Sequence, residues 1–323
     1  MKYAVWILVW IGTASLAGCR LVAVATAPGK KPAQTRSQEA LKADALFWET
    51  FHGGRYDQIP EALNAETAAY LANPSDAVTA AHVAFLHTWR VSEMARLDTP
   101  PATITDDIVL GQKYFQEAVK LNPHEARYQG FLASMMLAEG SINQDEKLTR
   151  DGYYRLLDAV KAWPEFNLFT AGYVMSQQPA HSERYQKAIA WQWETLDRCA
   201  GEKIDRNNPD FSRFMHQATT EGPRRVCWNS WIAPHNFEGF FMNMGDMLVK
   251  EGDWQMARKI YAQAKLSPTY GQWKYKDVLE QRIVGAQANV VSFNSNDPKL
   301  DKLHQRIMID TPVACMACHE STK

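Results

Sequence analysis

The sequence has almost no excess of charge of either sign, with 35 lysines and arginines against 36 aspartates and glutamates. Proteins that bind nucleic acid, or that are held at a membrane surface by charge, usually carry a clear basic excess. The balance therefore argues against a nucleic-acid partner and against a purely electrostatic attachment to membranes.

Long apolar runs, strand patterns and catalytic motifs are also missing. The longest apolar stretch, Tyr3 to Leu16, is shorter than the roughly 20 residues that a membrane-spanning helix needs. No useful length of alternating apolar and polar residues predicts a strand. G-x-S-x-G, H-E-x-x-H and Walker A motifs do not occur. These absences favour an electron carrier or a scaffold over an enzyme.

Cysteine is scarce, with five residues in the chain, and the first of them lies in an export signal. Leu16-Ala17-Gly18-Cys19 closes the apolar stretch and resembles the lipobox of bacterial lipoproteins. The resemblance implies a signal peptide over 1–18 and a lipid on Cys19, with an ordinary signal peptide as the alternative. Arg20 in place of Asp implies an outer-membrane anchor that faces the periplasm. Two or three acyl chains give stable anchoring.

Two further cysteines form the pattern Cys315-Met316-Ala317-Cys318-His319, which is typical of covalent haem attachment. Thiols three positions apart can each bond one haem vinyl group, and the adjacent His319 supplies an axial nitrogen to the iron. A thiol redox pair and half of a zinc site are the alternatives. The chain resembles c-type cytochromes in this motif alone, and the resemblance implies one covalent haem c.

The sixth iron ligand has to come from upstream, from another chain or from water, because few residues follow the motif. We expect a short helix over 297–309, where His304 and Met308 are four positions apart and share a face. Both side chains can bind haem iron. His304 is the first candidate for the distal ligand and Met308 the second.

The remaining pair, Cys199 and Cys227, favours a disulfide in an exported protein. It would close the polar stretch 200–226, which is part of a long insertion, 200–234, in an otherwise helical chain. Two buried free thiols are the alternative. Aromatic residues follow the insertion, and they predict either a helical core or a wall against which a haem docks.

Residues 19–37, rich in Ala, Pro and basic side chains, predict a flexible tether. Helical periodicity then extends over 38–290, and the stretch from Met244 to Ala264 resembles a tetratricopeptide repeat. Gly245 matches the small residue where the two helices of a repeat cross, and Ala257 lines the second helix. The resemblance implies an all-α solenoid of stacked antiparallel helical pairs, followed by an irregular haem-binding tail over 291–323.

Together these features predict an envelope lipoprotein with a single C-terminal c-type haem. The expected function is electron transfer or redox sensing in a membrane-associated complex, with the repeats docking an envelope protein partner. One alternative is a non-enzymatic scaffold that assembles an envelope complex. Another is a haem enzyme with an open sixth site, such as a peroxidase.

Overall fold

The computed structural model describes residues 20–230, 232 and 237–319, so the signal-peptide and Cys19 predictions lie outside it. The chain divides into two units, Met1–Pro32 and Ala33–Lys323, and the fold below is that of the second. In the first unit, residues 20–25 are helical. None of the described helices has the length and apolar character that crossing a membrane requires.

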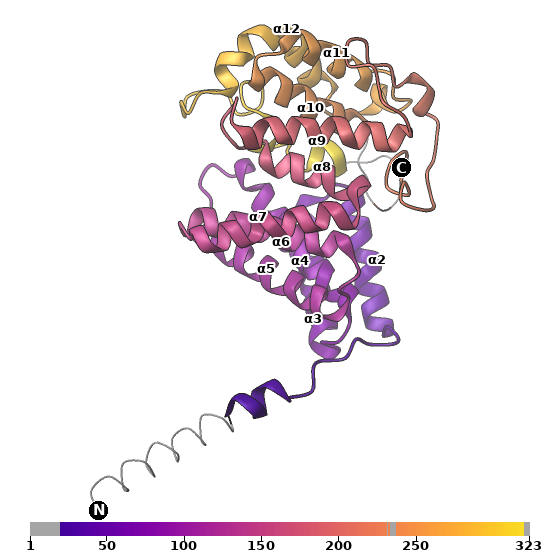
Figure 1. The fold of residues 1–323 in the computed structure, drawn as a ribbon, viewed down its shortest axis with the longest axis vertical. Coiled ribbons are helices and arrows are strands. Elements are labelled where there is room, and N and C mark those ends of the chain that lie inside the picture. Colours follow the sequence, from indigo (N-terminus) through magenta and orange to yellow (C-terminus); the bar gives the residue numbers. More distant parts are fainter. Residues whose placement is uncertain (1–19, 231, 233–236, 320–323) are drawn as a thin grey trace, which may run out of the picture. The chain divides into compact units, whose positions relative to one another are not determined.

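The second unit is all-α, and its described residues contain no strand. Helices that follow one another in sequence pack as antiparallel pairs, as the fold-class prediction required (Figure 1). The helices are α2 (Gln38–His52), α3 (Ile59–Ala72), α4 (Ala77–Ser92), α5 (Ile104–Leu121), α6 (Ala126–Ile142), α7 (Glu146–Ala162), α8 (Pro164–Met175), α9 (Glu183–Ala200), α10 (Phe237–Glu251), α11 (Trp254–Ala264), α12 (Lys276–Phe293) and α13 (Met316–His319).

Several helices begin where a short polar side chain accepts a hydrogen bond from the first turn. Ser37 accepts from the backbone N–H of Ala40, Asp76 from those of Val78 and Thr79, and Asp253 from that of Met256. Such caps satisfy N–H groups that have no partner inside the helix, and each stabilises the helix by about 1 kcal/mol. The sequence therefore sets these boundaries locally.

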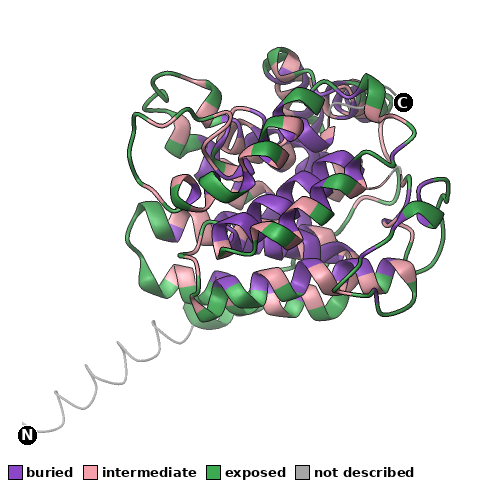
Figure 2. Ribbon diagram, turned by 90° about the horizontal axis from the view of Figure 1, so that it is seen from above, coloured by how far each residue is buried: buried purple, intermediate pink, exposed green. Residues whose placement is uncertain are grey.

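Small residues let the paired helices approach closely. A Cβ placed on Gly245 of α10 would lie 2.2 Å from Tyr261 of α11, and Ala257 is fully buried in the same contact. The prediction that Gly245 and Ala257 lie between paired helices is confirmed. Figure 2 shows the buried residues gathered on the faces that helices turn toward one another, with exposed residues on the outer faces.

The expected helix over 297–309 is wrong. Residues 297–307 form turns, and a short 3-10 helix follows at Met308–Asp310. The side chains of Asp297 and Asp301 accept hydrogen bonds from the backbone N–H groups two residues further on, at 2.9 Å each. Aspartate turns of this kind compete with the hydrogen bonds of a helix, and in this segment the turns form in place of the helix.

A buried charged cluster fixes this tail to the helical body. Asp246 of α10 accepts hydrogen bonds from the Tyr261 hydroxyl and the Met308 N–H, both at 2.7 Å, and pairs with Arg282 of α12. Arg282 also donates to the carbonyls of Leu303 and Arg306. The tail therefore folds back over the array, and α13 packs against α10.

Candidate haem-binding site

Cys315 and His319 line a pocket that is walled mainly by aromatic rings. We call it the aromatic pocket. Apart from His319 of α13, its helical lining comes from α2, α4, α6 and α8, which is one helix from each of the first four pairs. Its residues are Phe47, Trp48, Phe51, Phe85, Thr88, Trp89, Ser92, Arg127, Phe131, Phe166, Ile232, Cys315 and His319.

The end of α4 holds Cys315 in place. The Cys315 Sγ lies 2.7 Å from the hydroxyl oxygen of Ser92, and its backbone N–H donates to Glu93 at 3.0 Å. One turn later, Arg96 donates to the carbonyl of Pro312 at 3.0 Å. Together these three contacts hold residues 312–315 against the C-terminal end of α4 and the residues just after it.

His319 ends the short helix α13 and turns its ring toward α2 and α4. The ring centroid lies 4.1 Å from that of Phe51 and 6.2 Å from that of Trp89. The backbone N–H of His319 donates to the carbonyl of Cys315 at 2.9 Å, so the two residues lie one helical turn apart and line one pocket. An iron ligand at His319 would be enclosed by apolar rings that limit access of water.

Cys318 is buried against α10 and does not line the aromatic pocket. A Cβ placed on Gly239 would lie 2.5 Å from both the Cys318 Sγ and the Ala317 carbonyl oxygen. Only a glycine lets α10 approach the motif so closely. Trp273 adds a hydrogen bond from its indole N–H to the same carbonyl at 3.2 Å.

The surroundings of both thiols disfavour the thiol-redox alternative. Burial raises the pKa of Cys315 well above its usual value, and the nearby Glu93 carboxyl raises it further. Burial likewise raises the pKa of Cys318 to about 12. Because the thiolate is the form that attacks disulfides, thiols held protonated in this way are poor redox groups.

Part of the motif fits a haem. The lining of the aromatic pocket is mainly aromatic with a few polar groups, which is the character of a cofactor site. Arg127 supplies a cation at the pocket, where it also pairs with Glu125 at 2.8 Å. If bound there, haem would supply one-electron chemistry at its iron. Cys315 would hold the haem and His319 would bind the iron, whereas Cys318, which is buried against α10, would have to move to form the second thioether.

Glu93 is an ionisable group that sequence reasoning missed. Its side chain is fully buried, and this burial raises the pKa of Glu93 to about 7. The nearest cation, Arg96, lies 3.7 Å from the second carboxylate oxygen and lowers the pKa only partly. A carboxyl that titrates near neutral pH therefore contacts the backbone of Cys315.

Neither predicted distal ligand lines the aromatic pocket. His304 is partly exposed and its imidazole pairs with Asp301. Met308 is fully buried in the main core of the helical body. The structure therefore brings Cys315 and His319 together but places His304 and Met308 elsewhere.

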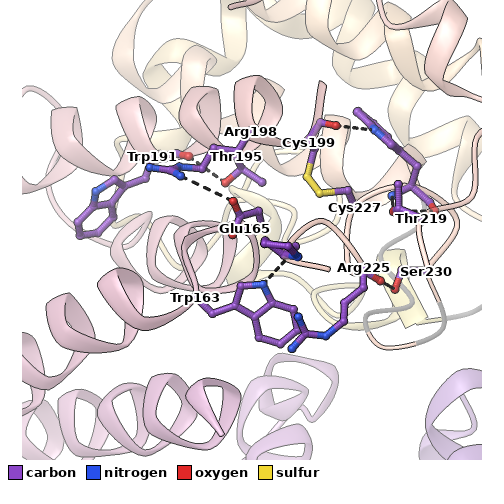
Figure 3. The surroundings of a disulfide bond; sticks show 12 residues. Trp163, Glu165, Trp191, Thr195, Arg198, Cys199, Thr219, Arg225, Cys227 and Ser230 are labelled. Carbon is purple, nitrogen blue, oxygen red and sulfur yellow. Dashed lines mark hydrogen bonds and ion pairs between the residues drawn. A yellow bond between two sulfur atoms is a disulfide. The ribbon is translucent and has the colours of Figure 1, made fainter. Parts of the chain in front are cut away.

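The predicted disulfide between Cys199 and Cys227 is confirmed (Figure 3). The two Cα atoms are 5.3 Å apart, within the range that a disulfide allows. A disulfide indicates an oxidising compartment outside the cytoplasm. The aromatic residues Trp228, Phe237, Phe240 and Phe241 pack beside it in the core and line a different pocket, so they do not form a wall around the motif.

Comparison of the chain with protein-family models, with curated proteins and with solved structures found no match.

The aromatic pocket was not predicted from the sequence. Its one local signal was the group Phe47, Trp48 and Phe51, which places two rings four residues apart on α2.

Proposed function

We propose that this protein is a lipid-anchored envelope protein that carries one covalent haem c and transfers electrons or senses redox state. The observation that carries the proposal is the position of Cys315 and His319 at the aromatic pocket. A haem attached there would be covered largely by the helical body. Burial from water raises the reduction potential of a haem and protects its iron.

The proposal assigns the helical pairs to the tetratricopeptide class. Its support is α10 with α11, where Gly245 lies at the crossing and Ala257, Tyr261 and Ala264 are all fully buried. Arrays of such pairs offer a continuous surface for a partner. We propose that this surface docks an envelope protein, and that lipid on Cys19 anchors the chain in the outer membrane.

The haem is tested with protein from a host that has a cytochrome c maturation system. Intact-mass analysis should show one added haem, and a pyridine haemochrome spectrum should identify it as type c. Changing Cys315 and Cys318 together to Ala should abolish both signals. The matched control, Cys199→Ser with Cys227→Ser, should keep them. Unmodified wild-type protein would end the haem proposal and leave the scaffold function.

The aromatic pocket is tested by midpoint potential. Phe51→Ala should lower the potential of the haem, because water would reach it and stabilise the more highly charged oxidised iron. Tyr154→Ala, at an exposed position on α7, is the control and should leave the potential unchanged. Equal potentials in Phe51→Ala and wild type would place the haem outside the pocket.

An open-site haem enzyme is the second candidate, and the placement of His304 and Met308 away from the pocket lining favours it. Visible spectra of His304→Ala and Met308→Ala separate the cases. A shift to high spin in one variant would identify that residue as the distal ligand. Unchanged spectra in both, with a Soret change on adding cyanide or peroxide, would support the enzyme.

The anchor is tested separately. Cys19→Ser should release the mature protein into the soluble fraction or leave the precursor uncleaved. A variant that is cleaved and still sediments with membranes like the wild type would contradict the lipoprotein proposal.

A further inference from the structure

Three helices of the first two pairs bring a histidine and two carboxylates together. The Nδ1 of His82 on α4 lies 2.9 Å from Oδ1 of Asp44 on α2 and 3.0 Å from Oε1 of Glu66 on α3. These three atoms lie within 4.8 Å of one another. His82 and Glu66 are buried, and the Asp44 side chain is 22% exposed.

The charged groups of this cluster leave an excess of negative charge unless a proton or a further cation is bound. Asp44, Glu66 and the adjacent Asp76 carry three carboxylates, while Arg36 is the one guanidinium among the described residues that pairs with them. Even a protonated His82 would leave one negative charge. A divalent cation beside a neutral His82 would balance the cluster, and buried charges are stable only when they are paired.

The hydrogen bonds are also incomplete. An imidazole carries at most one hydrogen on Nδ1, so His82 cannot donate fully to both Asp44 and Glu66. The second oxygen of Glu66, Oε2, is buried and has no hydrogen-bond partner among the described residues. Such an atom costs free energy unless something binds it.

The groups around the cluster suit a metal site. Arg36 holds Oδ2 of Asp44 at 3.2 Å, so Oδ1 is directed toward His82 and Glu66. Phe47 stacks on the His82 ring at 3.8 Å and fixes its plane. Metal ligands are usually oriented by such outer contacts. The partly exposed side chain of Asp44 leaves one side of the cluster open to solvent.

We propose that Asp44, Glu66 and His82 bind a divalent zinc-class metal ion with three protein ligands and an open fourth position. One imidazole and two carboxylates are ligands that zinc accepts, at about 2.0–2.2 Å. In a tetrahedral site this length separates neighbouring ligand atoms by about 3.3 Å, so the distances of 2.9 and 3.0 Å from Nδ1 of His82 would each need to widen by only a few tenths of an ångström. The proposal is independent of the haem.

The test uses the full mature protein without a polyhistidine tag, stripped with a chelator and dialysed against micromolar zinc chloride. Elemental analysis should count one zinc per chain, and zinc should raise the melting temperature. Glu66→Gln should weaken zinc binding at least tenfold. Asp44→Asn at the partly exposed position should do the same, and it keeps the test valid if Glu66→Gln fails to fold.

Two controls separate this site from others. Asp107→Asn changes a similar contact between α4 and α5, where His87 and Arg90 of α4 lie 2.7 and 3.3 Å from the carboxylate of Asp107 on α5, and it should keep one zinc. Cys315→Ala with Cys318→Ala removes the motif thiols and should also keep it. Wild type without zinc, zinc retained in both Glu66→Gln and Asp44→Asn, or zinc lost with the motif thiols would each overturn the proposal.

Discussion

Two buried charged clusters of this protein differ in how far their charges are compensated. Both oxygens of Asp246 are used, by Tyr261, Arg282 and Met308, and Arg282 in turn binds two carbonyls of the tail. Around His82, three carboxylates meet one guanidinium. A cluster whose charges are compensated can hold two segments of the chain together, whereas an uncompensated cluster indicates a bound ligand.

The largest effect is expected from breaking the compensated cluster. Arg282→Ala leaves the Asp246 carboxylate buried without its cation, which should lower the free energy of unfolding by roughly 3–5 kcal/mol. Urea unfolding followed by circular dichroism measures it. Lys265→Ala, in the exposed pair with Glu280, is the control and should cost less than about 1 kcal/mol. Equal losses in both variants would remove the contrast between the clusters.

Glu93 is an intermediate case, with one distant cation and a pKa raised to about 7 from an ordinary 4.5. The folded state therefore binds this proton more tightly than the unfolded state. The resulting stability is complete below about pH 4.5 and is lost as pH rises through 7.

Relative to Glu93→Gln, the wild type should thus lose roughly 3 kcal/mol of unfolding free energy between these pH values. Denaturant unfolding of both proteins across this window measures the difference, and using the difference cancels other titrating groups. Parallel curves for the two proteins would show that Glu93 ionises normally.

A smaller effect is expected at the helix crossing beside the compensated cluster. In Gly245→Ala the new methyl group collides with the ring of Tyr261 and moves its hydroxyl away from Asp246. Overpacking of this kind should cost roughly 1–3 kcal/mol. Gly271→Ala, where no atom lies within 4 Å of the added carbon, is the matched control and should be nearly neutral in thermal unfolding.

The smallest effect is expected at the uncompensated cluster without metal. Glu66→Gln removes one of the excess negative charges and keeps the shape of the side chain. It should change the unfolding free energy of zinc-free protein by less than about 1 kcal/mol, or raise it. Thermal unfolding in chelator measures this. A loss of several kcal/mol would show that Glu66 is already compensated, and it would erase the contrast with Asp246.

Local sequence patterns predicted the parts of this protein that depend on neighbouring residues. Helical periodicity predicted the all-α class, and the small Gly245 predicted a close crossing. Cysteine count and compartment predicted the pairing of Cys199 with Cys227. The helix expected over 297–309 failed because Asp297 and Asp301 form local turns that periodicity does not register.

The candidate site could be predicted only in part. The motif from Cys315 to His319 gave two of its residues, but the rings that enclose them come from four helices spread over α2 to α8. No periodicity links residues so far apart in sequence. The cluster of Asp44, Glu66 and His82 was missed for the same reason, because each helix contributes one polar residue to an otherwise ordinary core face.

The contact between α4 and the motif also determines the order in which the parts of this protein fold. Ser92 and Cys315 are 223 residues apart, whereas the helical pairs that form the pocket join neighbours in sequence. Closing so long a loop costs free energy that grows only slowly with length, but contacts between distant residues form late. The helical body should therefore be assembled first, with the pocket open. Docking of the tail then comes last, and it places Cys315 beside Ser92 and Cys318 beside Gly239.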